Sequence, residues 1–98
     1  MEGSTEEGIR ATLGVVRWED LRGHVERDGL ILVDPPLEVL EVALALAEDR
    51  VDIVGRWLEE GRIHKPDAAT LAAVDASPDV SFQMVICQPW VVAQMLAN

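Results

Sequence analysis

Two hydrophobic periods divide the chain into predicted helices and strands. Apolar residues recur at helical spacing opposite charged residues over 17–27, which predicts a helix. The four consecutive apolar residues 30–33 lie between an Asp-Gly turn and an Asp-Pro-Pro sequence, a pattern typical of a short strand buried on both faces. The β-branched and apolar residues 81–87 predict a second strand, which Pro89 ends.

Residues 35–48 predict the most apolar helix of the chain. Its charged residues, Glu38, Glu41 and Glu48, occupy one narrow stripe, and the remaining helical positions are almost all Leu, Val or Ala. Asp34 is expected to be the N-cap of this helix, with proline at the first helical position. A small domain has few elements to cover such a helix, so we expect another subunit to cover part of it.

Two further helices are predicted in the second half of the chain. One covers residues 50–60, is capped by Asp49 and ends at Gly61. The residues before it form either a tight corner or a bend within one longer helix. The other, 68–75, is short and Ala-rich and is capped by Asp67.

The order of these elements predicts a small single domain of the α/β or α+β class with four to five helices. Two apolar strands separated by helices most simply lie parallel, joined by a crossover that places the helices on one face. Two strands alone make a poor sheet. Either residues 61–65 therefore supply a third strand, or the sheet is completed across a dimer interface.

The two ends of the chain give less definite patterns. The apolar residues 90–98 are expected to form a terminal helix, with an edge extension of the sheet as the alternative. Residues 1–8 are polar and acidic and are expected to be a disordered or fraying tail before a domain that covers 9–98.

Composition and charge argue against several classes of protein. The chain has 98 residues and a net charge of −10, and 49% of its residues are apolar. This apolar content argues against a disordered tail, and the scattered cations argue against binding to nucleic acid or to anionic membranes. No secretory signal is visible, and the longest apolar run, 42–47, is too short to span a membrane. The single cysteine, Cys87, is expected to be a buried thiol, and we expect a cytoplasmic protein.

Several segments carry a resemblance to a known family between Trp18 and Gln94. They are Leu-Ile-Leu-Val-Asp-Pro at 30–35, Leu-Glu-Val-Leu-Glu-Val-Ala at 37–43 and Val-Ile-Cys-Gln-Pro-Trp-Val-Val-Ala-Gln at 85–94. Isolated residues add to them: Trp18, Leu21, His24, Arg27, Asp49, Trp57, Gly61, Lys65, Pro66 and Phe82. With these residues the chain resembles the small bacterial proteins of the DUF2288 family, and it departs from their pattern at Val74 and Ala93. The resemblance implies a soluble bacterial protein and carries no activity with it, because the family has none assigned.

Polar residues follow both predicted strands, each directly before a proline. If the strands are parallel neighbours, Asp34 and Gln88 lie side by side at the carboxyl edge of the sheet, where open α/β sheets bind ligands. Glu38 and Glu41 follow Asp34 at helical spacing, and His24 borders the apolar face of the first helix. These five residues form the hypothetical ligand site. The alternative is a helix cap, a strand-end hydrogen bond and a solvated acidic stripe. No metal site and no cofactor are predicted.

The apolar character of residues 35–48 makes self-association the leading functional hypothesis. We expect a non-enzymatic homodimer or other homo-oligomer that acts through protein contacts. Its interface is predicted to contain Leu37, Leu40, Leu44, Trp90, Val92 and Met95. The alternative is a small ligand-binding or enzymatic domain that uses Asp34 and Gln88.

Overall fold

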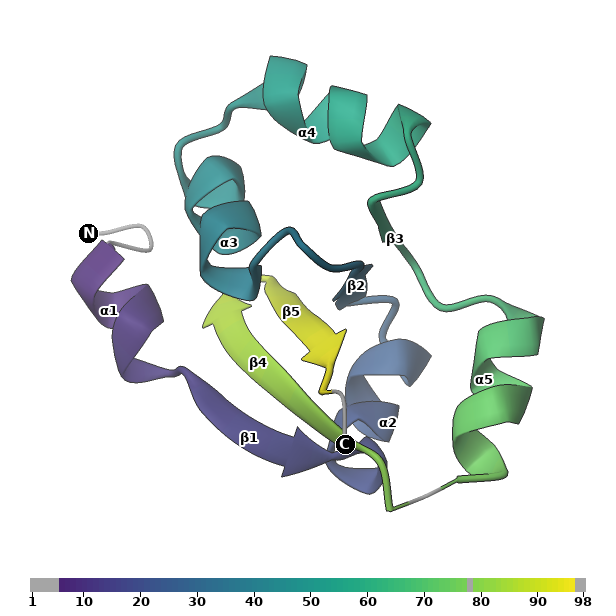
Figure 1. The fold of residues 1–98 in the computed structure, drawn as a ribbon. Coiled ribbons are helices and arrows are strands. Elements are labelled where there is room, and N and C mark those ends of the chain that lie inside the picture. Colours follow the sequence, from purple (N-terminus) through teal and green to yellow (C-terminus); the bar gives the residue numbers. More distant parts are fainter. Residues whose placement is uncertain (1–5, 78, 97–98) are drawn as a thin grey trace.

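The computed structural model describes residues 6–77 and 79–96, which form five helices around one mixed sheet (Figure 1). The helices are α1 (Glu6–Ala11), α2 (Trp18–Glu26), α3 (Val39–Ala47), α4 (Val51–Glu59) and α5 (Ala68–Asp75). The strands are β1 (Gly14–Arg17), β2 (Leu30–Val33), β3 (Ile63–His64), β4 (Ser81–Cys87) and β5 (Trp90–Met95). The predicted α/β or α+β class is confirmed.

Strand β5 lies at the centre of the sheet, whose order is β1-β4-β5-β2-β3. It pairs antiparallel with β4 through a turn at Gln88 and Pro89, and it pairs parallel with β2. Strands β2 and β4 are therefore not neighbours and run in opposite directions, so the predicted parallel pair is wrong. The third strand expected within 61–65 is present as β3, which pairs antiparallel with β2.

The helix predicted over 90–98 is wrong for its described part, because residues 90–95 form β5. Trp90, Val91 and Val92 carry aromatic or branched side chains, which pack better on a pleated sheet than along a helix. A proline before the segment fits a hairpin turn as well as a helix start, so Pro89 does not distinguish the two. Residues 97 and 98 lie outside the described residues.

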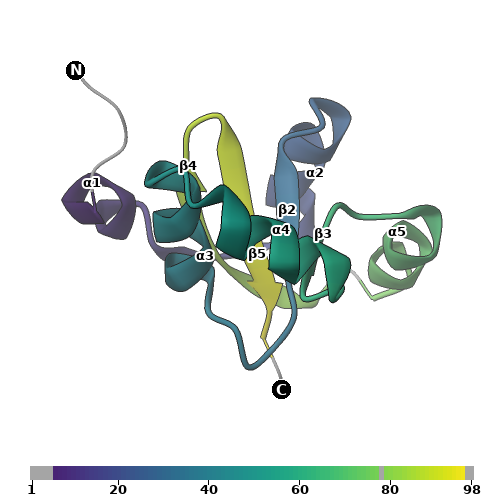
Figure 2. The ribbon, with the colours of Figure 1, turned by 90° about the horizontal axis from the view of Figure 1, so that it is seen from above.

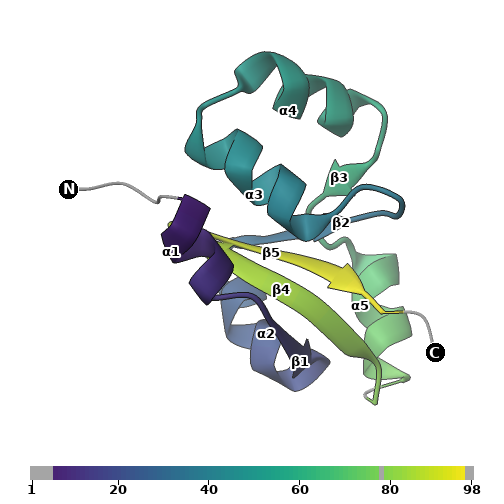
Figure 3. The same cartoon turned by 60° about the vertical axis from the view of Figure 1, so that its left-hand side comes forward.

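Helices cover both faces of the sheet, and not one face as the strand order had predicted. Strand β2 shows this alternation, because Ile31 and Val33 pack with α3 on one face while Leu30 and Leu32 pack with α2 and α5 on the other. Figure 3 shows α3 and α4 on one side of the sheet and α2 on the opposite side. Helices α1 and α5 lie at opposite ends of the domain (Figure 2).

Helix α3 is covered within its own chain. Its buried residues are Val39, Val42, Ala43 and Ala45, and it lies between the sheet and α4, with α1 also in contact (Figure 3). It begins at Val39 and not at the predicted residue 35. Both residues that precede the two prolines are pushed out of the helical region by the proline ring that follows. The second subunit expected over α3 is therefore not needed to bury it.

The segment between α3 and α4 is a tight corner. Asp49 has a φ of 58°, in the left-handed region, so the two helices cannot be one bent helix. Asp49 also does not cap α4, since the N-cap position is Arg50, without a side-chain bond. Gly61, with a φ of 72°, ends α4 as predicted.

The structure describes the last three residues of the predicted tail and the single cysteine. Within the proposed tail 1–8, residues 6–8 belong to α1, whose Ile9 is buried against the α3 side of the sheet. The remainder of that tail lies outside the described residues. Cys87 is buried, as predicted. None of the helices in the described ranges has the length and apolar content that a membrane span requires.

Candidate functional site

Asp34 stands at the carboxyl end of β2, beside His64 of β3. The distance between Asp34 Oδ1 and His64 Nε2 is 3.3 Å. The backbone holds this arrangement, because the Asp34 N–H donates to the Arg62 carbonyl at 2.8 Å. The side-chain amide of Gln94 on β5 donates to the Leu37 carbonyl at 2.6 Å and so fixes the loop that follows Asp34.

A hollow of about 180 Å³ lies next to this pair, between the sheet, α2 and α5. Apolar residues form most of its wall, and Asp34, His64 and Thr70 supply its polar groups; the apolar residues are Trp18, Leu32, Val33, Val74, Phe82 and Met95. A second hollow, of about 310 Å³, shares Val33, Asp34 and Met95 with it. The two hollows therefore adjoin each other at Asp34 and Met95.

Gln88 does not belong to this site. It lies in the turn after β4, and β4 is antiparallel to β5, which is parallel to β2. The turn is therefore near the start of β2, while Asp34 is at its end. The prediction that Asp34 and Gln88 lie side by side is wrong. Strand β5 lies between β2 and β4, and β4 runs in the opposite direction to β2, so the ends of these two strands are at opposite edges of the sheet.

The other residues of the hypothetical site are also apart from Asp34. Glu38 and Glu41 are exposed, and α3 begins only at Val39, so Asp34 does not share a helical face with them. His24 is half-buried in α2 and lines neither hollow. No group of three His, Cys, Asp or Glu side chains in the described ranges is placed to hold a metal ion.

His64 is the residue at Asp34 that the sequence did not single out. Its position follows from the pairing of Leu32 with His64 in the short strand β3. A two-residue strand leaves almost no periodic signal, so only the third-strand alternative pointed to it. The second ring nitrogen, Nδ1, lies 3.4 Å from the Lys65 carbonyl, so both nitrogens face oxygen atoms.

Thr70 stands at the edge of the hollow through the N-terminus of α5. The Asp67 side chain accepts a hydrogen bond from the Thr70 N–H at 2.8 Å, which confirms Asp67 as the predicted N-cap. The backbone N–H and then the hydroxyl of Thr70 stabilise the Asp67 carboxylate and lower its pKa. The Thr70 hydroxyl is therefore engaged by Asp67.

Most of the predicted interface residues pack inside the chain. Leu37 is 8% exposed and Val92 is fully buried, so neither offers a surface to a partner. Leu40, Leu44 and Trp90 are partly buried against the α3 side of the core. Met95 is 49% exposed and lines both hollows at Asp34. The interface prediction is wrong for the buried residues because α1, α4 and the sheet already cover them.

Large apolar side chains are exposed on α4, as they also are at Leu13, Val15 and Met95. On α4, Val51 is 72% exposed and Leu58 is 55% exposed. Together with Val54 and Gly55 they occupy positions i, i+3, i+4 and i+7, and we call these four residues the α4 face. The sequence pattern predicts an apolar face of this helix that includes Val51, Val54 and Leu58 together with Ile53 and Trp57, and it does not show which of these residues stay exposed.

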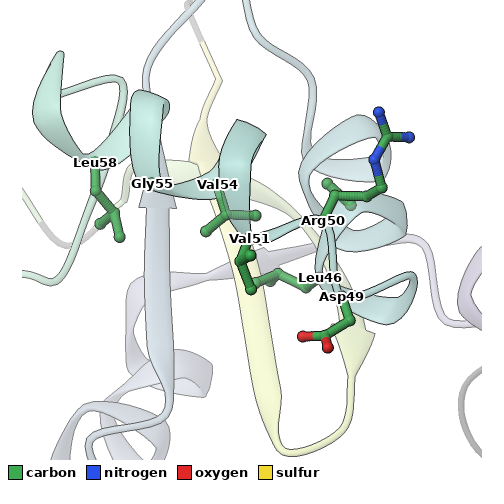
Figure 4. A pocket seen from close by; sticks show the side chains of 8 residues that line it. Leu46, Asp49, Arg50, Val51, Val54, Gly55 and Leu58 are labelled. Atoms are coloured by element: carbon green, nitrogen blue, oxygen red, sulfur yellow. The ribbon is translucent and has the colours of Figure 1, made fainter.

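A hollow of about 270 Å³ runs along the α4 face. Figure 4 shows Val51, Val54 and Leu58 projecting to the same side of α4, while Leu46 reaches toward Val51 from the end of α3. The Asp49 carboxylate lies at one end of the hollow, and the Arg50 side chain points away from it (Figure 4). Its lining is thus mainly aliphatic, with polar groups at one end.

The comparisons with known proteins place this fold among uncharacterised proteins. The NMR solution structure of PA1075 from Pseudomonas Aeruginosa is similar to the chain at 30% sequence identity and a TM-score of 0.83. The match covers 99% of this chain and 90% of that one. No curated protein matches the chain. The family model described as "Protein of unknown function (DUF2288)" matches residues 4–95, and the chain therefore belongs to the DUF2288 family.

Proposed function

We propose that this protein is a self-associating interaction domain whose α4 face binds the α4 face of a second copy. The observation that carries the proposal is the exposure of Val51 and Leu58 on either side of Gly55. A contiguous apolar strip on a small acidic protein is typical of an interaction site. The strip replaces residues 35–48 as the expected place of contact, because α3 is covered.

Gly55 supports a close approach by another helix. A glycine within a helix costs roughly 0.5–1 kcal/mol relative to alanine. A Cβ atom added at Gly55 would meet no atom of the described residues within 4 Å. Nothing in the described ranges, 6–77 and 79–96, therefore requires a glycine here. A second helix that crosses α4 at this position would gain from the glycine, because small residues let two helix backbones come close together.

The α4 face matches itself about a two-fold axis. In an antiparallel crossing centred between Val54 and Gly55, Val51 of one copy lies at the height of Leu58 of the other, and Gly55 of each copy lies at the height of Val54 of the other. Asp52 precedes the centre of this crossing and Arg56 follows it, so Asp52 of one copy and Arg56 of the other differ in height by about one residue's rise along the helix. The same crossing brings Asp52 of each copy near Arg56 of the other.

The charge of Arg56 fits this arrangement. Among the described residues Arg56, like Arg17 and Arg27, makes no ion pair, whereas Arg10, Arg22, Arg50 and Arg62 each do. The two-fold crossing would give Arg56 a carboxylate partner twice over. Exposed ion pairs add little affinity. In this arrangement the Asp52–Arg56 pairs set the relative orientation of the helices, and the aliphatic residues supply the free energy of binding.

The test is the oligomeric state of a charged variant of the α4 face. We expect the wild-type protein to show a concentration-dependent dimer in sedimentation velocity, and Val51→Glu to remain a monomer. A glutamate in the first turn of α4 favours the helix, so the variant should stay folded. The matched control is Val15→Glu, which changes an equally aliphatic, 66% exposed residue on β1 and adds the same charge.

Two results would contradict the proposal. One is a wild-type protein that stays monomeric at every concentration up to the millimolar range. The other is a dimer that Val15→Glu disrupts and Val51→Glu does not, which would place the contact at the β1 edge of the sheet.

A further inference from the structure

We infer that the hollow at Asp34 binds a small molecule with one cationic amino group on a compact apolar body. This site is separate from the α4 face, and it would stand whether or not the protein dimerises. It lies where β2 and β5, the parallel pair of the sheet, both reach their carboxyl ends. The chain leaves the sheet at the carboxyl ends of these strands, and open α/β sheets bind ligands at that edge.

The wall of the hollow fits an apolar body. Trp18, Val74 and Phe82 are almost fully buried, and they enclose the hollow between α2, α5 and the sheet. A volume of about 180 Å³ is below the usual range of drug-sized sites, so the body is limited to about one ring. Met95 also lines the adjoining hollow of about 310 Å³. Methionine is flexible, so a rotation of this side chain would enlarge the site.

The polar groups at the hollow select a cation. His64 faces one oxygen of the Asp34 carboxylate, Oδ1, and no described residue bonds to the other, Oδ2. The nearby cations are engaged elsewhere, since Lys65 pairs with Asp28 at 2.8 Å and Arg62 pairs with Glu60 at 2.7 Å. The Asp34 side chain is 58% exposed, so water reaches this oxygen, and an N⁺–H donor of a ligand in the apolar hollow would take the place of that water.

Helix α5 can admit such a ligand. Val74 is its only buried residue and Leu71 packs partly buried beside it, so two apolar side chains hold the helix to the core. Its C-terminal end is tied down through Asp75, which accepts a hydrogen bond from the Trp18 indole at 3.1 Å and pairs with Arg22. Its N-terminal end, next to Thr70 and the mouth of the hollow, has no comparable tie to the sheet among the described residues. A small outward movement of that end is therefore inexpensive.

The experiment compares ligands that differ only in charge. Benzylamine and benzyl alcohol are titrated into the full chain, and the backbone amide shifts are followed by NMR. We expect benzylamine to shift the amides of Val33, Thr70 and Met95 in a saturable way. Benzyl alcohol, which offers a neutral donor, is expected to bind about tenfold more weakly.

A pair of isosteric variants isolates the carboxylate. Asp34→Asn should weaken benzylamine binding about tenfold and leave benzyl alcohol binding unchanged. Glu38→Gln removes the same charge from an exposed neighbour outside the hollow and should change neither. An Asp34→Asn variant that lost its fold would show in its amide spectrum, and Met95→Ala would then serve. Met95 lines both hollows, so its replacement by alanine enlarges the space at Asp34. Met95→Ala should therefore favour the larger naphthylmethylamine over benzylamine.

The inference is overturned if the two wild-type titrations give equal affinities, or if the shifts lie outside the residues around Asp34. It is also overturned if Asp34→Asn and Glu38→Gln have the same effect. None of these results bears on the dimer, because the α4 face shares no residue with this hollow.

Discussion

The cap of α5 shows how one hydrogen-bonded carboxylate ties stability to pH. Asp67 accepts from the Thr70 N–H, and this bond, with the Thr70 hydroxyl, lowers the Asp67 pKa below its ordinary value of 3.8. A carboxylate with a lowered folded-state pKa stabilises the fold at pH values above its unfolded-state pKa. That stabilisation is lost as the pH falls through the folded-state pKa.

Removal of this cap is expected to have a pH-dependent effect. Asp67→Ala should lower the melting temperature at neutral pH, because the first turn of α5 loses its acceptor. The difference from the wild type should shrink as the pH falls below about 4, where the unfolded aspartate becomes protonated. Thermal unfolding followed by circular dichroism across this range measures it.

Asp67→Asn is the control for the charge. Asparagine is also a good N-cap, so this variant should keep most of the stability and should lack the pH dependence of the aspartate. A difference between wild type and Asp67→Ala that stays constant down to low pH would show that the cap does not depend on ionisation.

Three aspartates precede predicted helices, and the preference for aspartate at the N-cap predicts that all three are caps. Only Asp67 caps a helix. Asp49 takes a left-handed conformation, and Asp34, which precedes two prolines, lies beside His64 instead. The helices themselves could be predicted, but the role of each aspartate could not, because it depends on the two or three backbone angles that follow it.

At the scale of elements, one substitution in α4 should change the stability of the monomer and the affinity of the dimer in opposite directions. Gly55→Ala should raise the free energy of unfolding of the monomer by about 1 kcal/mol, because alanine favours the helix and its Cβ meets no atom of the described residues within 4 Å. The same change should weaken the dimer, since two Cβ atoms would hold the helices apart. Urea unfolding of the dilute protein and sedimentation velocity of the concentrated protein measure the two effects.

A higher free energy of unfolding together with a weaker dimer is the diagnostic result for Gly55→Ala. If the variant is more stable and associates as well as the wild type, the helices do not cross at this residue. If Ala72→Gly, a change to an exposed position of α5, weakens the dimer as strongly as Gly55→Ala, the effect is not local to α4.

Local pattern was sufficient for some elements and not for others. The strands 30–33 and 81–87 have the predicted bounds, because branched and apolar runs between turn residues leave few alternatives. Residues 90–98 are apolar and follow Pro89, and this pattern favoured a helix over an extension of the sheet. The segment 90–95 lies between two strands and has burial on both faces, so the polar alternation that marks a half-exposed strand is missing.

At the scale of the molecule, Val92 tests whether the two apolar segments of the chain build a core or an interface. It is fully buried in the central strand. Val92→Ala should therefore lower the free energy of unfolding by about 2 kcal/mol, from lost burial and the cavity left behind. Urea unfolding at a concentration where the protein is a monomer measures this change.

The dissociation constant gives the control for Val92. It should be nearly unchanged for the folded variant, because the side chain does not reach the surface. A variant that is as stable as the wild type but no longer dimerises would restore Val92 to the interface.

The candidate site could be predicted only in part, since it depends on the order of the strands. The carboxyl end of β2 was the expected position, and Asp34 is there. Its neighbours were not predictable, because β5 entered between β2 and β4 and a two-residue strand brought in His64. Such pairings are contacts between distant parts of the chain, and no local pattern records them.

The central place of β5 also has a consequence during protein synthesis. Strands β1 and β4 lie on one side of it and β2 and β3 on the other, and a ribosome makes all four before it makes residues 90–95. Until then each half of the sheet has an unpaired edge toward the missing strand. The nascent chain must therefore keep two half-sheets apart and out of contact with other chains until translation has passed Met95.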